Sequence, residues 1–254
     1  MKKFLFLTKC FCTLLILSSN AQAKSNNEHI LSCINPIGHH LYFEEYKCPV
    51  GGETFQALTL GVHSTYGMYL DLKPISYMDM STPVPVCPSN GFVIFKENFS
   101  KEELDKIKII IKSETYKKIF KEKNASNYLY YNLAKEIKDP DIDLWWVLLK
   151  ATWEADSCGN RELYKKYAQE TIEVAEKELT KAKKEDQNYW MLSLIIPELY
   201  RRTGDFEQAQ IWAKKIDTSL MPESNYKDYM KLAYKLLKKS IKKKNLEPVP
   251  VEEK

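Results

Sequence analysis

The hydrophobic and polar positions divide this 254-residue chain into regions of different character. Apolar residues run almost without a break from Phe4 to Leu17, and no later stretch approaches the ~20 apolar residues that span a bilayer. Short strand-like runs at 53–60, 84–86 and 92–95, separated by prolines and glycines, predict a small β module over residues 24–98. Apolar positions at helical spacing then predict an α-helical region over residues 99–244, so the pattern indicates an α+β fold.

The N-terminal apolar run has the features of a secretory signal peptide. Lys2 and Lys3 precede it, and Ala21-Gln22-Ala23 follows as a small-x-small processing site. Residues 1–23 are therefore expected to be removed by cleavage near Ala23, which leaves no integral membrane segment. The leader carries three lysines and no acid, so cleavage lowers the formal net charge from +4 to +1. We expect a protein of the bacterial periplasm that does not bind nucleic acid.

Two cysteine segments carry the candidate chemistry of the β module, Cys48-Pro49-Val50-Gly51-Gly52 and Cys87-Pro88-Ser89-Asn90-Gly91. Each resembles one half of a zinc ribbon, in which two Cys-Pro-x-Cys-Gly knuckles hold one tetrahedral metal through four thiolates. Gly51 and Asn90 stand at the second thiolate positions. We therefore expect that this site does not bind zinc as a complete ribbon does.

The cysteines that remain after cleavage predict disulfides, because their number is even and the compartment oxidises thiols. Facing knuckles direct their first cysteines at a shared centre, which favours Cys48–Cys87 and leaves Cys33–Cys158 as the second pair. A bond that closes 38 intervening residues is worth about 3 to 4 kcal/mol in the chain-entropy model. We expect this bond to take over the structural role of the metal.

A second interpretation retains zinc on Cys48 and Cys87, with histidines drawn from His39, His40 or His63. Two cysteines and two histidines are a legitimate zinc set. None of these histidines lies at knuckle-like spacing from a cysteine, so we favour the disulfide and expect no cofactor. The pair His39-His40 is more simply explained as part of a solvated loop.

The helical region begins with a capping box, Ser100-Lys101-Glu102-Glu103. One helix pair has close to tetratricopeptide spacing, in which Gly204 makes the turn while Ala209 and Ala213 allow close packing. This predicts a tetratricopeptide-like array of roughly seven helices. The last segment, residues 245–254, contains two prolines among acids and is expected to be a disordered tail. The expected helix breaks lie at 138–141, 157–160, 203–204 and 221–222.

The two knuckles, the spacer motif Asp71-Leu72-Lys73-Pro74 and the helical segment from Glu198 to Ala209 together resemble the bacterial domain of unknown function 2225 family. The likeness covers most of residues 46–216. It implies a zinc ribbon fused to tetratricopeptide-like helices, with no assigned reaction. Of the ligands that the resemblance implies, Cys48 and Cys87 are retained while Gly51 and Asn90 depart from the pattern.

The sequence contains no catalytic motif, so we expect the protein not to be an enzyme. It has no glycine-rich phosphate loop, no His-Glu-x-x-His and no Gly-x-Ser-x-Gly, and its four histidines all precede residue 64. The rival hypothesis is a hydrolase or redox protein that uses one of the cysteines.

The expected function is that of a periplasmic interaction or scaffold protein with a protein or peptide partner. Arg201 and Arg202, beside the Gly204 turn, are candidates to be exposed and to bind a partner's carboxylate, or they complement the helix C-terminus. Trp212 is a further candidate contact, although we expect most aromatic residues of the helices to fill the core. Lysines crowd the end of the last helix, where they suit the helix dipole or bind an anionic lipid or polymer: Lys238, Lys239, Lys242, Lys243 and Lys244.

Overall fold

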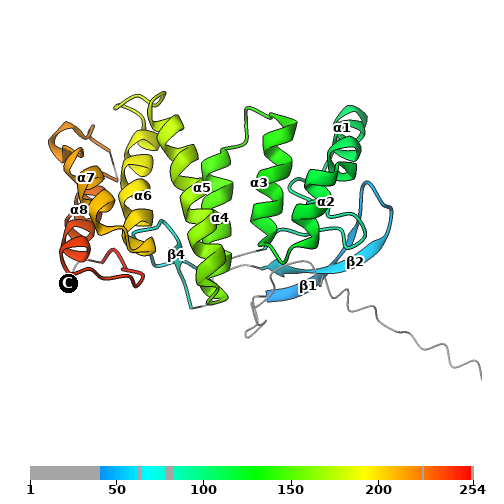
Figure 1. Ribbon diagram of the computed structural model, residues 1–254, viewed down its shortest axis with the longest axis horizontal. Coiled ribbons are helices and arrows are strands. Elements are labelled where there is room, and N and C mark those ends of the chain that lie inside the picture. The colour runs from blue at the N-terminus through cyan, green and yellow to red at the C-terminus, as the bar shows by residue number, and fades with distance from the viewer. Residues whose placement is uncertain (1–40, 62–63, 78–82, 225, 253–254) are drawn as a thin grey trace, which may run out of the picture.

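The computed structural model describes residues 41–61, 64–77, 83–224 and 226–252. Small antiparallel β hairpins come first along the chain and α-helices follow, which confirms the expected α+β fold. The helices stand side by side in one row, with α1 at one end and α7 and α8 at the other (Figure 1). The predicted signal peptide, Cys33 and all four histidines lie outside the described residues.

The β elements of the described chain form two separate two-stranded sheets. The first hairpin places Lys47 opposite Thr54, directly beside the first knuckle. The runs expected at 84–86 and 92–95 make a single bridge between Val86 and Val93 instead of full strands. Two-stranded sheets are marginally stable by themselves, so the module depends on cross-links and on the helices. The strands are β1 (Leu41–Lys47), β2 (Thr54–Leu60), β3 (Gly67–Met68) and β4 (Pro74–Ile75).

The array contains eight α-helices within the described ranges, and each packs against its neighbour in the chain. All four predicted helix breaks are present, but the breaks at Ser113, at 122–125 and at 180–186 were not predicted, because no glycine or proline marks them. The helices are α1 (Lys101–Lys112), α2 (Glu114–Lys121), α3 (Ser126–Ile137), α4 (Leu144–Ser157), α5 (Arg161–Leu179), α6 (Gln187–Thr203), α7 (Phe206–Lys214) and α8 (Lys227–Lys242), with a 3-10 turn at Thr218–Leu220.

The predicted local signals at helix ends are present. Ser100 Oγ accepts from the Glu103 amide at 3.2 Å, and a Glu103 carboxylate oxygen accepts from the Ser100 amide at 2.7 Å, which completes the capping box of α1. Gly204 ends α6 with a φ of +97°, a conformation that glycine adopts without strain. Ala209 of α7 is fully buried beyond this turn, so the backbones of α6 and α7 approach closely.

The hydrophobic core consists of two clusters. The first lies between the knuckles and the first three helices and includes Cys48, Cys87 and Phe120. The second runs along the array from α3 to α8 and contains Trp145 and Trp153. Most aromatic side chains of the array lie inside this second cluster or pack against it, as expected. Because the first cluster takes side chains from both sides of residue 98, the knuckles and the helices form one packing unit.

The spacer between the knuckles reaches into the array. The carbonyl of Asp71 accepts from Trp153 Nε1 at 3.2 Å, and Lys73 Nζ donates to Ser157 Oγ at 2.9 Å, so both ends of this turn are held by α4. Asp71 is 3% exposed. The spacer therefore belongs structurally to the helical array and not only to the β module.

The C-terminal segment is ordered through Glu252, contrary to the expected disordered tail. Leu70 N donates to Val249 O, and Val251 N donates to Met68 O, both at 2.9 Å. Val251 is buried in the core of the array. The tail thus pairs with the β3 region like a short edge strand, and its two prolines are compatible with this extended conformation.

Candidate functional site

The two cysteine segments fold into equivalent loops. In each, the cysteine amide donates to the carbonyl five residues later, at 2.8 Å, and the glycine amide four residues later donates back to the cysteine carbonyl, at 2.8 Å for Cys48 and 2.9 Å for Cys87. The two glycines, Gly52 and Gly91, have φ values of +78° and +75°. These are the left-handed conformations expected of a knuckle turn.

The first cysteines of the two loops are joined, as the ribbon pattern predicted. The Cys48–Cys87 bond has an S–S distance of 2.17 Å and a Cα–Cα distance of 5.7 Å. The two residues are 1% and 0% exposed. The Gly51 amide donates to Cys48 Sγ at 3.2 Å, and Asn90 Nδ2 donates to the same sulfur at 3.6 Å. A buried disulfide therefore occupies the centre that a ribbon gives to its metal.

This oxidised centre does not fit a four-coordinate zinc ion. Both retained sulfurs are in the disulfide and neither is a thiolate. A Cβ atom at Gly51 would lie 1.9 Å from a Glu53 carboxylate oxygen, so that carboxylate fills the space of the missing ligand. The histidines proposed as further ligands, His39 and His63, lie outside the described residues.

Glu53 forms a second link between the loops, which the sequence did not predict. One of its carboxylate oxygens accepts from Ser89 Oγ at 2.5 Å and from the Ser89 amide at 3.4 Å. Its carboxylate also lies with Cys48 and Cys87 in a group whose ligand atoms are within 4.8 Å of one another. Only its position directly after the first knuckle could have singled it out.

The second predicted disulfide is only partly within the described chain. Cys158 is half-buried directly after α4 and does not carry a free thiol. Its expected partner Cys33 lies outside the described residues, so the pair Cys33–Cys158 stays a prediction.

Arg201 is completely buried, which corrects its interpretation as an exposed partner contact. Its guanidinium pairs with Glu198 through two hydrogen bonds, of 2.6 and 2.7 Å. It also donates to the carbonyls of Asn245 and, at 3.1 Å, Glu247. Burial raises the pKa of Glu198, and the hydrogen bonds from Arg201 oppose that rise. Arg201 therefore anchors the chain's own tail to α6.

Arg202 is also buried, at 1% exposure, and likewise binds the chain's own acids. Its Nη2 donates to Asp156 at 2.6 Å, and its Nη1 lies 3.8 Å from Asp71 Oδ2. Burial raises the pKa of Asp71, although the charge of Arg202 opposes this. The Tyr164 ring lies against the guanidinium, with its centroid 5.1 Å from Cζ. The spacer is thus held to the array by a buried ion-pair network.

Glu154 is a further buried acid that sequence reasoning missed. Its two oxygens accept from the amides of Ser126 and Asn127, both at 2.9 Å, and from both of their side chains. These amides are at the N-terminus of α3, where a carboxylate is favourable. Burial nevertheless raises the pKa of Glu154 to about 7. No signal near residue 154 in the sequence indicates this contact, because its partners precede it by almost thirty residues.

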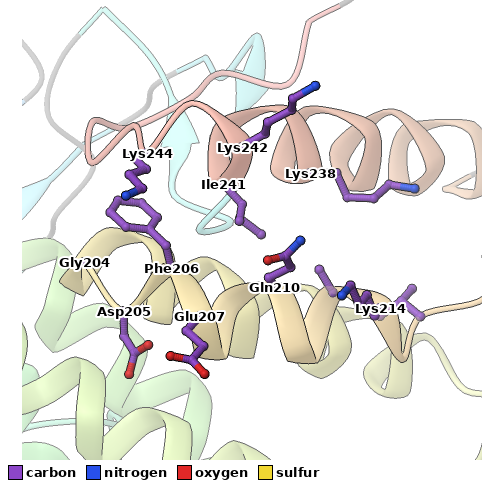
Figure 2. A pocket seen from close by; sticks show the side chains of 12 residues that line it. Gly204, Asp205, Phe206, Glu207, Gln210, Lys214, Lys238, Ile241, Lys242 and Lys244 are labelled. Atoms are coloured by element: carbon purple, nitrogen blue, oxygen red, sulfur yellow. The ribbon is translucent and has the colours of Figure 1, made fainter.

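A cleft of about 1140 Å³ lies between α7 and α8 (Figure 2). The side chains of Phe206, Gln210 and Ile241 lie between the two helices, while the carboxylates of Asp205 and Glu207 point away from α8. The cleft thus combines an apolar floor with a basic rim, which its further lining residues complete: Gly204, Ala213, Lys214, Ile216, Lys238, Lys242 and Lys244.

Trp212, the remaining predicted partner contact, lies on α7 but does not line this cleft. It is half-buried, packs against the core, and has Lys215 Nζ 3.5 Å from its ring centroid. Among the predicted candidates, only lysines of the last helix and its end are brought to the cleft.

No family model, no curated protein and no solved structure matches this chain. Within the described part of the chain, every helix is too short or too polar to cross a membrane.

Proposed function

We propose that this protein is an exported interaction or scaffold protein. The helical array supplies its binding surface, and the disulfide-closed knuckles act as a structural clasp. The observation that carries this proposal is the open cleft between α7 and α8, because apolar side chains surrounded by polar ones are typical of surfaces that bind another protein.

The disulfide supports the proposed location in an oxidising compartment. A buried bond between Cys48 and Cys87 persists where thiols are oxidised, which is consistent with a secretory leader and a periplasmic location. Two equivalent knuckles followed by a helical array also support the proposed relation to the domain of unknown function 2225 family.

The placement of the buried acids argues for binding and against catalysis. Asp71, Glu154 and Glu198 have raised pKa values, but each lies in the packed core with partners from this chain. None of the three lines the cleft. The rival cysteine-dependent activity is disfavoured at Cys48 and Cys87, because their bond is buried and a substrate has no access to either sulfur.

The proposal is tested by placing a photo-reactive amino acid in the full-length protein in intact cells. Position Gln210 reports on the cleft, and exposed Glu162 on α5 is the matched control. We expect a discrete adduct at Gln210, and expect the captured protein, once purified, to bind the unmodified mature chain. Adducts no different from those at Glu162 would show that the cleft is not a binding surface.

A second candidate function is a zinc module, which the grouping of Glu53 with Cys48 and Cys87 favours. It requires reduction of the disulfide, because only thiolates bind the metal. Metal analysis of protein purified without chelator separates the two readings. If the scaffold proposal is right, the protein contains no zinc and no reactive thiol at these cysteines. If the protein is a zinc module, it contains about one zinc ion per chain, and Glu53→Gln lowers that zinc content.

A further inference from the structure

The cleft between α7 and α8 lies at the end of the helical row (Figure 1). Inside the row, each helix is covered on both sides by neighbours in the chain. At this end, the groove between α7 and α8 is lined by Phe206, Ala213, Ile216 and Ile241 and remains open among the described residues. Two packed helices with an apolar groove between them offer the site at which a further helix would continue such an array.

The charge of the groove selects the partner. Four lysines line it, Lys214, Lys238, Lys242 and Lys244, against two acids, Asp205 and Glu207, whose carboxylates point away from α8 (Figure 2). None of the four lysines forms an ion pair within the part of the chain that the structure describes. Lys238 and Lys242 are one helical turn apart on α8. Carboxylates spaced by four residues on a partner helix can therefore face both.

The chain's own remaining segment does not match this charge. Residues 24–40 contain one lysine and one glutamate and are otherwise uncharged apart from histidines, so they lack the acids that four lysines call for. The acidic tail is already held by Arg201 and by the β3 region. The complementary occupant is thus a separate molecule.

The concave shape favours a helix over a bilayer surface. The apolar side chains lie between the two helices, as Figure 2 shows for Phe206 and Ile241, where a flat membrane cannot contact them while it also lies on the lysines. A protruding amphipathic helix can make both contacts at once.

We propose that the α7–α8 cleft binds an acidic amphipathic helix of a protein partner, with its apolar face on the half-buried Phe206 and Ile216 and its carboxylates toward Lys238 and Lys242. This inference rests on the proposed function and specifies its partner. Electrostatic attraction speeds the encounter and the apolar floor holds the complex, so affinity falls as salt rises.

The test uses the full mature chain and a fluorescent peptide of about five helical turns. The peptide carries leucines at i, i+3, i+4 and i+7, with glutamates on the flanks of that face. Its controls are the same peptide with lysine in place of glutamate and a scrambled peptide of equal composition. We expect a saturable rise in fluorescence anisotropy, as protein is added, only with the acidic amphipathic peptide.

Matched variants locate the binding. Lys238→Glu with Lys242→Glu is expected to weaken binding at least tenfold. Lys231→Glu with Lys235→Glu makes the same charge change on exposed positions of α8 outside the cleft and is expected to weaken it less than threefold. Phe206→Ala, whose folding is checked by circular dichroism, is expected to weaken binding at least fivefold without a change of charge.

The inference would be overturned if the two double lysine variants lost the same affinity for the acidic peptide, or if Phe206→Ala bound it as tightly as the wild type. Vesicles of phosphatidylglycerol and phosphatidylcholine form a further arm: binding to them, with no binding of the acidic peptide, would assign the lysines to a membrane surface instead. If photo-crosslinking at Gln210 captures a specific partner while the peptide does not bind, this inference fails and the proposed function stands. If both experiments fail, the function fails as well.

Discussion

Removal of the Cys48–Cys87 disulfide tests whether it is the clasp of the β module. The perturbation is Cys48→Ala with Cys87→Ala, which leaves the other cysteines untouched, whereas a reductant would also open any second disulfide. The bond closes a loop of 38 intervening residues, so its loss releases about 4 kcal/mol of chain entropy in the unfolded state. Both sulfurs are buried, so the cavities that they leave in the double variant add about 1 kcal/mol to the loss of stability.

The loss is expected to appear first in the knuckles. They contribute to the first core cluster beside α1 to α3, whereas every tryptophan of the chain lies in α4, α6 or α7. Tryptophan fluorescence during urea unfolding thus reports on the array, and hydrogen exchange of the Gly52 and Gly91 amides reports on the knuckles. We expect the protection of these two amides to fall by about a thousandfold, with a smaller shift of the tryptophan transition.

Two controls make the result decisive. Ser89→Ala removes the hydroxyl that donates to Glu53 and keeps the disulfide, so it should cost only about 1 kcal/mol. Reduced wild-type protein with zinc should not regain the lost protection. If the exchange protection of the Gly52 and Gly91 amides falls by less than tenfold in the double variant, the disulfide is not the clasp. If zinc fully restores this protection in the reduced wild type, the metal module is favoured.

Three further predictions follow from single positions. Gly91→Ala should cost about 2 kcal/mol more than Gly52→Ala in urea unfolding, because both have a positive φ but only at Gly91 does a new Cβ meet the Phe120 ring, at 2.7 Å; equal costs would contradict this. Because burial raises the pKa of Glu154 to about 7, ionising it costs folding free energy. As the pH rises from about 4.5 to 7, the free energy of unfolding of the wild type should therefore fall by about 3 kcal/mol relative to that of Glu154→Gln. A relative rise of the wild type's free energy of unfolding would mean that the four hydrogen-bond donors around the carboxylate outweigh its desolvation. Arg201→Met should cost about 3 to 5 kcal/mol by leaving Glu198 unpaired, and it should release the Val251 amide to exchange, which a purely local loss would not do.

Features set by neighbouring residues could be predicted from the sequence. The capping box at Ser100, the turn at Gly204 and the two knuckles each depend on side chains within five residues, and the structure contains all of them. The Cys48–Cys87 pairing could be predicted although it is distant in sequence, because the two loops share one pattern.

Features set by distant partners could not be predicted. The tail looked disordered because Pro248 and Pro250 exclude a helix, but its order depends on pairing with residues 68–70. Arg201 looked exposed because arginine is rarely buried without a partner. Its partners include carbonyls more than forty residues later in the chain, and no local pattern identifies them.

The burial of the two arginines redirects the search for a partner site. Their charge is used within the molecule, by Glu198 and the tail carbonyls for Arg201 and by Asp156 and Asp71 for Arg202. A partner's carboxylate could reach them only by displacing these contacts, at the cost of unpaired buried charges. The lysines of the α7–α8 cleft carry no such cost, because they are exposed or line an open groove. An acidic partner therefore gains more free energy at the end of the array than at the arginines within it.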